Sequence, residues 1–585
     1  MQILNNSLLT YKKLFPFIKK KRKLQIYLSV TLSTITSLFE SMSVGLLFPF
    51  IASIIEPEKI FNIKFIKSLL NFFDLDKSNL TLLFASMFIF LVLLTAILKI
   101  ILIRINTKIS YPLVSEICMD MFNKIINQPY HMHLNRNSSD VIATVVMRSK
   151  SVGETTFFLI SIFNSLILST FIIGTILLIA PLEIVNILFL FTLFYFLIFQ
   201  FVRKKIKSIS STISHQSGNL VKSVQESLGS IREILIYKAA NFFVPRFKNS
   251  NFKLREAEGE TVFVAASPGP LSQAMVIISA IIFAYYLNNK EVLVGFIPIL
   301  SAVTLGVLKL VPSIQTVFSS FTSISGLEDS LNKTAEILCS KEKNNPYEEK
   351  NKDEKLKLLK FDNEIKFNNI NFSYPKNDNF RLSEINFKIK KGSTVGIKGV
   401  SGSGKSTLID LLLGLLKPSK GEILLDDKPL KNENMSYWQD KVAFVSQNIF
   451  LSDESISKNI ALSNDLKEVD IEKINKVIQD VNLDEYVNKS PEGINLKTGE
   501  RGSNLSSGQI QRLGIARALY KNKEIIILDE ATNALDKKNE NFIFDTLNKI
   551  KGLTLIFISH NEELMKRCDQ VLSIKDGKLS NINQT

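Results

Sequence analysis

The feature that most constrains this 585-residue chain is a series of long apolar runs, all of them in its first half. One run, LTLLFASMFIFLVLLTAIL at Leu80–Leu98, contains no charged residue. About 20 consecutive apolar residues are enough for a helix to cross a lipid bilayer. The sequence predicts six such spans, at residues 25–55, 80–104, 155–180, 182–202, 262–287 and 292–320.

Basic residues beside these runs predict the orientation of the chain. The formal net charge is +16, and clusters of Lys and Arg lie at Lys12–Lys23, Arg104–Lys108 and Arg203–Lys207. Such clusters stay on the cytoplasmic side of a membrane and attract anionic lipids. We therefore expect the N-terminus and the segments after the second and fourth spans to be cytoplasmic. The lipid bilayer, and not nucleic acid, is the expected partner of this charge.

The composition also predicts where the chain divides. The segments after the second and fourth spans mix polar and apolar residues and look helical, so we expect helices that continue well into the cytosol. A charged segment at 339–360 then separates residues 1–338 from residues 361–585. This last part alternates charge with short apolar stretches, as a soluble domain does.

A glycine-rich loop lies between a β-branched run and a helical run in the soluble part. The segment Thr394–Leu416, TVGIKGVSGSGKSTLIDLLLGLL, contains the pattern G-x-x-x-x-G-K-S. In such a loop, backbone N–H groups surround phosphates, Lys405 reaches the β- and γ-phosphates, and the Ser406 hydroxyl binds Mg²⁺. The helix that follows adds its positive N-terminal dipole. The predicted phosphate contacts are Gly399, Ser401, Gly402, Ser403, Gly404, Lys405, Ser406 and Thr407.

Two adjacent carboxylates follow the apolar run Ile525–Leu528. Ligands of open α/β sheets bind at the carboxyl ends of the strands, so a strand here would deliver Asp529 and Glu530 to the nucleotide. One carboxylate can hold Mg²⁺ through water while the other orients and polarises the attacking water. We assign Asp529 to the metal and Glu530 to the water.

The segment LSSGQIQRLGIARAL, Leu505–Leu519, places a small polar turn before a basic helix. The hydroxyl and N–H groups of Ser506, Ser507 and Gly508 could face an anion, although an ordinary helix N-cap would also explain the serines. The loop at Lys405 already encloses one side of the nucleotide. The turn is therefore better placed to meet the γ-phosphate of a nucleotide held by a second copy of the domain.

Four motifs follow one another in the soluble part: GVSGSGKST, LSSGQIQRLGIARAL, IIILDEATNALD and FISHN. Their order and spacing resemble the Walker A, signature, Walker B with D-loop, and switch-histidine motifs of ATP-binding-cassette transporters. Six spans before one cassette resemble a half-transporter of the exporter type. The signature residues would be Ser506, Ser507, Gly508 and Gln509, and Ser507 is a departure because the commonest signature has glycine there.

The resemblance implies roles for further residues. Tyr374 matches the aromatic residue that stacks on adenine, and Gln447 matches the Q-loop glutamine that contacts Mg²⁺. His560 matches the switch histidine at the γ-phosphate, and Asp536 matches the D-loop aspartate that crosses the dimer. With Glu530, Gln447 and His560 would form the catalytic set.

The resemblance also implies a fold and an ATP-driven transport cycle. The fold would be an α-helical transmembrane bundle of six spans with long cytosolic extensions, followed by an α/β P-loop nucleotide-binding domain. Two identical chains would bind ATP and Mg²⁺, close their cassettes and turn the membrane halves outward, and ATP hydrolysis would reset them. The protein would be a multi-pass protein of the inner (plasma) membrane, with its N-terminus and cassette in the cytoplasm.

The sequence of the membrane half indicates the class of substrate. The segments Leu38–Ile51, Asn127–Asp140 and Ser230–Phe247 resemble those of flippases for lipid-linked oligosaccharides and surface polysaccharides of bacteria. A lipid pyrophosphate is anionic, so Lys99 and Lys309, near the inner ends of their spans, are candidate cavity residues. Snorkelling to the cytosolic surface would also explain Lys99. Glu40 either pairs with one lysine or faces a hydrated cavity.

Three functions are therefore compatible with the sequence. The first is an ATP-driven homodimeric flippase for a lipid-linked saccharide, and the second is an exporter of peptides or hydrophobic compounds. The third is a membrane-tethered ATPase that moves no cargo, which would leave the long cytosolic extensions idle. Few Asp and Glu residues occur in the other spans, which argues against cationic drugs. We expect the first function.

Overall fold

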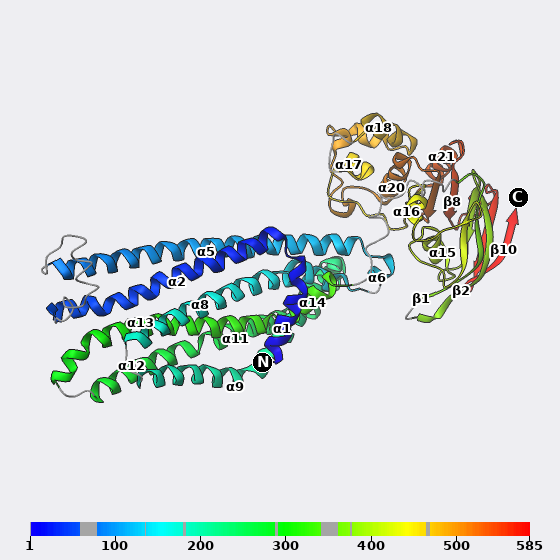
Figure 1. Ribbon diagram of the computed structural model, residues 1–585. Helices are drawn as coiled ribbons and strands as arrows, with labels where there is room; N and C mark the ends of the chain where they lie inside the picture. The colour runs from blue at the N-terminus through cyan, green and yellow to red at the C-terminus, as the bar shows by residue number, and fades with distance from the viewer. Residues whose placement is uncertain are drawn as a thin grey trace. The chain divides into compact units, whose positions relative to one another are not determined.

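The structure is a computed structural model that describes residues 2–55, 57–58, 79–134, 136–179, 183–286, 290–340, 361–374, 377–463 and 469–584 (Figure 1). It divides into two compact units. Unit 1 consists of Met1–Asn127 and Arg136–Glu342, and unit 2 consists of Gln128–Asn135 and Lys343–Thr585. Nearly all of the predicted linker at 339–360 lies outside the described residues.

The described part of unit 1 is helical. Its helices are α1 (Gln2–Leu14), α2 (Lys20–Ile55), α5 (Leu80–Ile126), α7 (Ser138–Ile142), α8 (Lys150–Ile179), α9 (Glu183–Gly229), α10 (Ile231–Ile236), α11 (Ala240–Ala266), α12 (Pro268–Tyr286), α13 (Lys290–Gly326) and α14 (Glu328–Leu338). A six-residue π-helix, Ala143–Arg148, joins α7 to α8. Helix α2 packs against α5 and α8, and α13 packs against α8 and α2.

Five helical segments of the described chain are long and apolar enough to cross a membrane: Lys20–Ile55, Leu80–Ile126, Ser138–Ile179, Ala240–Ile278 and Ile297–Gly326. They correspond to five of the six predicted spans. The remaining one, 182–202, falls in the first part of α9, where most side chains lie outside the described residues. Six spans therefore stays a prediction.

The segments predicted to extend beyond the bilayer are part of long continuous helices. Helices α5 and α9 each contain 47 residues. At a rise of 1.5 Å per residue such a helix is about 70 Å long, more than twice the ~30 Å thickness of the hydrocarbon core.

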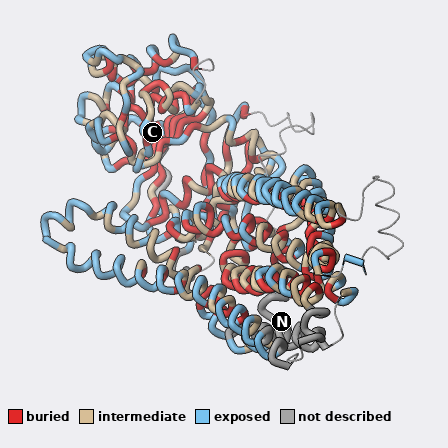
Figure 2. The backbone as a smooth tube through the Cα atoms, turned by 90° about the vertical axis from the view of Figure 1, so that its left-hand side faces the viewer, coloured by how far each residue is buried: buried red, intermediate tan, exposed pale blue. Residues whose placement is uncertain are grey.

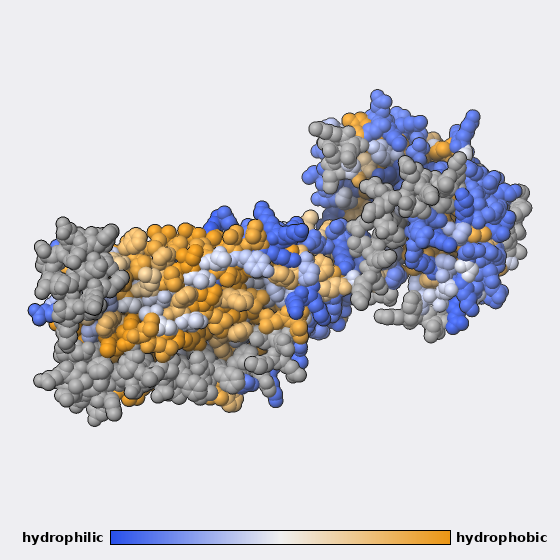
Figure 3. Space-filling model, in the orientation of Figure 1, coloured by the Kyte–Doolittle hydropathy of each residue, from blue (hydrophilic) through white to orange (hydrophobic). Residues whose placement is uncertain are grey.

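Helix α2 shows the polarity expected of a helix in lipid. Its buried residues include Ser29, Ser33, Ser37 and Glu40, which recur every three or four positions and so share one face. Large apolar side chains on other faces are exposed, among them Tyr27, Leu28, Ile35, Leu38 and Met42. Figure 3 shows the resulting hydrophobic surface over the helices of unit 1, with a paler band running along it. The polar face is therefore directed to the inside of the helical bundle and the apolar faces to lipid.

Unit 2 contains two sheets. The larger has the strand order β10 (Lys578–Gln584), β9 (Gln570–Lys575), β3 (Thr394–Lys398), β8 (Thr554–Ile558), β7 (Ile525–Asp529) and β6 (Val442–Val445). All neighbours in it are parallel except β10 and β9. The smaller sheet is antiparallel, in the order β2 (Asn377–Lys390), β1 (Glu364–Tyr374), β4 (Lys420–Leu425) and β5 (Lys428–Pro429).

Apart from α6 (Tyr130–Leu134), the helices of unit 2 lie between these strands in the chain, as an α/β fold requires. They are α15 (Lys405–Leu412), α16 (Met435–Gln439), α17 (Ile456–Ala461), α18 (Ile471–Asp480), α19 (Asp484–Lys489), α20 (Ser507–Lys521), α21 (Lys537–Asn548) and α22 (Glu562–Met565). The parallel strands are short and consist mainly of Ile, Val, Leu and Phe, because both faces of such a sheet are covered.

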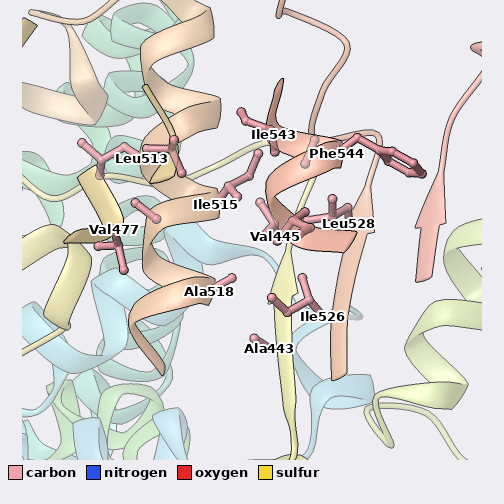
Figure 4. Close-up of a cluster of buried hydrophobic side chains, with 14 of the residues drawn as sticks. Ala443, Val445, Val477, Leu513, Ile515, Ala518, Ile526, Leu528, Ile543 and Phe544 are labelled. Carbon is pink, nitrogen blue, oxygen red and sulfur yellow. The ribbon is translucent and has the colours of Figure 1, made fainter. Parts of the chain in front are cut away.

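Two hydrophobic clusters hold the parallel sheet in place. In one of them, side chains of α20 and α21 pack with β6 and β7, including Val445, Leu513, Ile515, Ile526, Leu528, Ile543 and Phe544 (Figure 4). Buried residues concentrate along the strands of unit 2 (Figure 2). This packing therefore fixes the positions of the strand ends.

A charged contact joins the start of β7 to two neighbouring segments. The Glu524 carboxylate accepts hydrogen bonds from Lys391, at 3.2 Å, and from Lys441. Partial burial raises the pKa of Glu524, but the two lysine contacts outweigh it and hold the pKa below its usual value. The stabilisation is therefore present above the ordinary pKa of a glutamate and is lost as the pH falls toward the folded-state value.

We expect Glu524→Gln to destabilise unit 2 at neutral pH, by no more than about 1 kcal/mol because the carboxylate is partly exposed. The difference should shrink below about pH 4.5. Trp438 is the only tryptophan and is fully buried, so its fluorescence in the full chain reports the unfolding of unit 2. Glu485→Gln, in a 3.9 Å pair with the exposed Lys489, is the control and should change nothing.

Candidate functional site

The register of the parallel sheet brings four strand ends to one edge. Asp529 of β7 lies opposite Ile558 of β8, and Ile397 of β3 pairs with the same Ile558. Val445, the last residue of β6, pairs with Leu528. The segments that follow these strands carry the P-loop, Glu530, His560 and Gln447, so the structure places all of them along this edge, where α/β sheets bind ligands.

The loop between β3 and α15 has the backbone expected of a phosphate cradle. Gly402 and Gly404 have φ values of 81° and 111°, which only glycine adopts without strain. A Cβ at Gly399 would lie 2.4 Å from the carbonyl oxygen of Ile574, so this position needs glycine for close packing. The Ser403 hydroxyl is buried and has no hydrogen-bond partner in the described chain.

Lys405 begins α15 and its ammonium turns back over the loop. It donates to the carbonyl oxygens of Gly399, at 2.8 Å, and Val400, at 3.1 Å. The next residue, Ser406, hydrogen-bonds to Asp529. A hydroxyl beside a carboxylate is an oxygen donor set that suits Mg²⁺. Ser406 and Asp529, predicted as metal-binding residues, are thus in contact.

Two carboxyl groups at this edge are harder to ionise than usual. Burial, and next the neighbouring Glu530, raise the pKa of Asp529, while Lys405 and Ser406 lower it. Burial and the charge of Asp529 raise the pKa of Asp410 to about 6. The edge therefore holds a concentration of negative charge that favours a cation.

Glu530 has a strained backbone and three side-chain neighbours. Its φ of 51° is in the left-handed region. One carboxylate oxygen, Oε2, accepts hydrogen bonds from Gln447 Nε2 at 2.8 Å and Asn533 Nδ2 at 3.0 Å. The other, Oε1, lies 3.5 Å from Nε2 of His560. The structure thus brings the three predicted catalytic side chains together around one carboxylate.

Asn533 was not predicted as a site residue. It lies three positions after Glu530 in the turn that follows β7, so its amide reaches back to the carboxylate. Because it holds the same oxygen as Gln447, it leaves Oε1 to face His560. The only sequence signal was its spacing from Glu530, which by itself is weak.

We expect Asn533→Ala to lower the rate of ATP hydrolysis by about 10- to 100-fold, since a hydrogen bond to a charged group contributes about 1.5–3 kcal/mol. The KM for ATP should change little, because the Asn533 amide positions the Glu530 carboxylate. Steady-state kinetics of the reconstituted protein check this. A raised KM with an unchanged kcat would contradict the positioning role. Asn495→Ala, at an exposed position in a short helical turn after α19, is the control.

Tyr374, the predicted adenine-stacking residue, lies at the end of β1. Its hydroxyl is 3.2 Å from the Thr407 hydroxyl of α15, and its ring meets Phe372 edge to face at 5.0 Å. Tyr130 of α6 packs against the same hydrophobic cluster. Burial raises the pKa of Tyr130, followed by the nearby Asp410 and Tyr374. Tyr374 is therefore tied to the helix of the P-loop, and α6 lies close to that helix.

The signature segment forms the start of α20. Ser506 is the N-cap: its hydroxyl accepts from Gln509 N at 3.3 Å, and the Gln509 side chain accepts from Ser506 N at 2.8 Å. This capping box joins the two residues to each other and not to the P-loop. A Cβ at Gly508 would lie 3.2 Å from the carbonyl oxygen of Ala534, so glycine allows the D-loop to approach.

Asp536 is at the N-cap position of α21, at the end of the D-loop, and its side chain makes no capping hydrogen bond to the helix. Its carboxylate accepts from Asn539 Nδ2 at 2.5 Å, and this contact, with Arg512 nearby, keeps the pKa of Asp536 below its usual value. The D-loop is also tied to α20, because Ala534 N donates to Gln511 Oε1 at 2.8 Å. Signature and D-loop therefore form one connected surface of unit 2.

In unit 1 the three candidate cavity residues meet. Lys99 Nζ lies 2.6 Å from Glu40 Oε1, and Lys309 Nζ lies 3.4 Å from the same oxygen. Lys309 also donates to the Ser43 hydroxyl at 3.0 Å. Of the two alternatives for Glu40, pairing is the one observed, and it involves both lysines.

Comparisons with known proteins agree with this architecture. The family model of the ABC transporter transmembrane region matches residues 27–288, and that of the ABC transporter matches residues 382–533. A solved bacterial Atm1-family ABC exporter with ATP bound is similar in fold. Its TM-score is 0.78 at 19% identity, covering 97% of this chain and 95% of that one.

Curated relatives are also similar in sequence. The ATP-dependent lipid A-core flippase of Photobacterium profundum is 28% identical over 387 residues, 65% of this chain and 64% of the relative. The flippase of the same name from Escherichia coli is 29% identical over 384 residues, 64% of each chain. The chain thus spans somewhat less than two thirds of the length of these relatives. The two matched regions show that this chain contains an ABC transporter transmembrane region followed by an ABC transporter ATP-binding domain.

Proposed function

We propose that this protein is an ATP-driven exporter that works as a homodimer and flips a lipid-linked saccharide from the inner to the outer leaflet. The observation that carries the ATPase part is the convergence of the P-loop, Asp529, Gln447, Glu530 and His560 at one sheet edge. The apolar helices of the same chain supply the membrane path.

The residues at the edge divide the work of ATP hydrolysis. The P-loop amides and Lys405 bind the phosphates, and Tyr374 takes the adenine. Glu530 orients the attacking water and accepts its proton through the oxygen that is not held by Gln447 and Asn533. His560 faces that same oxygen and stabilises the γ-phosphate. Mg²⁺ at Ser406 and Asp529 would neutralise phosphate charge.

Two surfaces support a second copy as the partner. The signature and D-loop surface includes the start of α20, where the capping box engages the N–H groups of Ser506 and Gln509 and leaves those of Ser507 and Gly508 to a ligand. Around α10, large apolar side chains are exposed in a segment expected to be cytoplasmic: Leu228, Leu235, Ile236, Tyr237 and Phe242. An exposed apolar cluster outside the membrane is typical of a protein interface.

The saccharide-lipid substrate is supported by the relatives and by the interior of unit 1. The relatives are named ATP-dependent lipid A-core flippases. The polar face of α2 lies inside the bundle rather than toward lipid. A hydrophilic headgroup that crosses a bilayer needs such a lining.

The test is ATPase activity of the protein in vesicles with and without polyprenyl-pyrophosphate oligosaccharide, together with exposure of a labelled sugar to an outside reagent. ATP-dependent exposure of the sugar would support the proposal. Hydrolysis of ATP that neither moves the lipid nor responds to it would leave the ATPase and overturn the flippase.

A further inference from the structure

Unit 1 contains a cavity of about 400 Å³ between α2, α5, α8 and α13. Most of its lining residues have neutral polar side chains, such as Ser33, Ser37, Asn106 and Asn164, but the large apolar side chains of Leu102, Ile103, Phe157 and Leu168 also line it. The charged residues of the lining are Glu40 and Lys99, which have opposite signs and are paired at 2.6 Å. The cavity therefore offers neutral hydrogen-bonding groups beside apolar surface and has little net charge.

Two acceptor oxygens of this lining are buried without a partner. Glu40 Oε2 and Asn164 Oδ1 have no hydrogen bond among the residues that the structure describes. The Glu40 side chain is only 4% exposed. A buried acceptor costs free energy unless a donor reaches it, and more so within a membrane. These oxygens would be satisfied by a ligand that brings hydrogen-bond donors.

The cations near the cavity are already engaged. Lys99 and Lys309 both lie within 3.4 Å of Glu40 Oε1, and Lys309 also donates to Ser43. A phosphate would have to displace the carboxylate from the lysines and would bring only more acceptors to Glu40 Oε2. Sugar hydroxyl groups require no displacement, because each can donate to an oxygen and accept from a Ser or Thr hydroxyl.

We propose that this cavity binds the carbohydrate of the substrate, with Glu40 Oε2 and Asn164 Oδ1 accepting hydrogen bonds from sugar hydroxyl groups. The inference rests on the proposed flippase function and adds that the sugar, and not the pyrophosphate, is the part recognised here. Glu40 thus has two roles, since Oε1 neutralises the lysines while Oε2 faces the ligand.

The experiment uses the full chain in proteoliposomes and measures stimulation of its ATPase by two probes. One probe is undecaprenyl pyrophosphate that carries an oligosaccharide, and the other is undecaprenyl pyrophosphate without sugar. The unchanged protein should respond to the glycosylated lipid at lower concentration. Asn164→Ala should raise the half-maximal concentration of the glycosylated lipid about tenfold, the effect of one lost hydrogen bond, and should not shift that of the sugar-free lipid.

Ser169→Ala is the matched control. Ser169 is on the same helix, and its hydroxyl is also buried without a partner, but it does not line the cavity. It should alter neither response. Asn164→Ser keeps one hydroxyl oxygen and should give a smaller shift than Asn164→Ala, which keeps the test available if the alanine variant folds poorly.

The possible outcomes distinguish carbohydrate recognition in the cavity from the proposed flippase function. Equal responses of the unchanged protein to both lipids, or an equal shift of both in Asn164→Ala, would overturn carbohydrate recognition and leave a polyprenyl-pyrophosphate flippase. An ATPase that responds to neither lipid would overturn the proposed function itself. Only a shift confined to the glycosylated lipid supports the cavity as its sugar site.

Discussion

Replacing Glu530 with glutamine should stop ATP hydrolysis while ATP still binds. Glutamine has the same shape and can meet the φ of 51° at the same cost, so the fold should not change. It cannot accept the proton of the attacking water, and the loss of a general base lowers a rate by about 10²–10⁴-fold. Release of phosphate and binding of a fluorescent ATP analogue, measured on the same sample, check both parts.

The P-loop explains why binding should survive this change. The contacts expected to hold the nucleotide come from the loop before α15, whereas the described hydrogen bonds of the Glu530 carboxylate are with Gln447 and Asn533. Glu563→Gln, on the exposed surface of α22, is the control and should hydrolyse ATP at the normal rate. Retained turnover in Glu530→Gln would show that another group activates the water.

Much of the soluble half could be predicted from the sequence because its signals are local. The P-loop needs glycine at positions of positive φ, as at Gly404, and the buried strand β7 needs a continuous apolar run before Asp529. Both requirements appear within a few residues of the chain. The strand-end placement of Asp529, Glu530 and His560 then follows from the parallel order of the sheet.

Contacts that join distant segments could not be predicted in the same way. The two lysines of the membrane half were found as charges within apolar runs, but their joint pairing with Glu40 depends on how three helices pack. The amide of Asn533 was missed because a turn, and not a motif, returns it to Glu530. Gln128–Asn135 likewise belongs to unit 2 because of its packing, and the hydropathy of the sequence could not predict this.

The largest effect on stability is expected from Glu40→Ala. Glu40 lies inside the bundle with 4% of its side chain exposed, and it is the counter-charge of both Lys99 and Lys309. Removing one partner of a buried ion pair leaves an uncompensated charge, which costs about 3–5 kcal/mol in soluble proteins. We expect a loss toward the lower end, because lysine can partly snorkel. The loss of the monodisperse peak of the detergent-solubilised chain with temperature measures it.

Lys99 and Lys309 should contribute unequally to the loss of stability in Glu40→Ala. The side chain of Lys309 is 22% exposed and that of Lys99 is 48% exposed, so Lys309 carries the more deeply buried charge. Adding Lys309→Met to Glu40→Ala should therefore restore most of the lost stability, since it removes the unpaired charge and keeps the apolar stem. Adding Lys99→Met should restore less, because its ammonium can reach water. Equal rescue by both, or by neither, would mean that Glu40 stabilises the bundle through something other than its charge. Pairing with Glu40 would then no longer be a reason why the two lysines do not bind a phosphate.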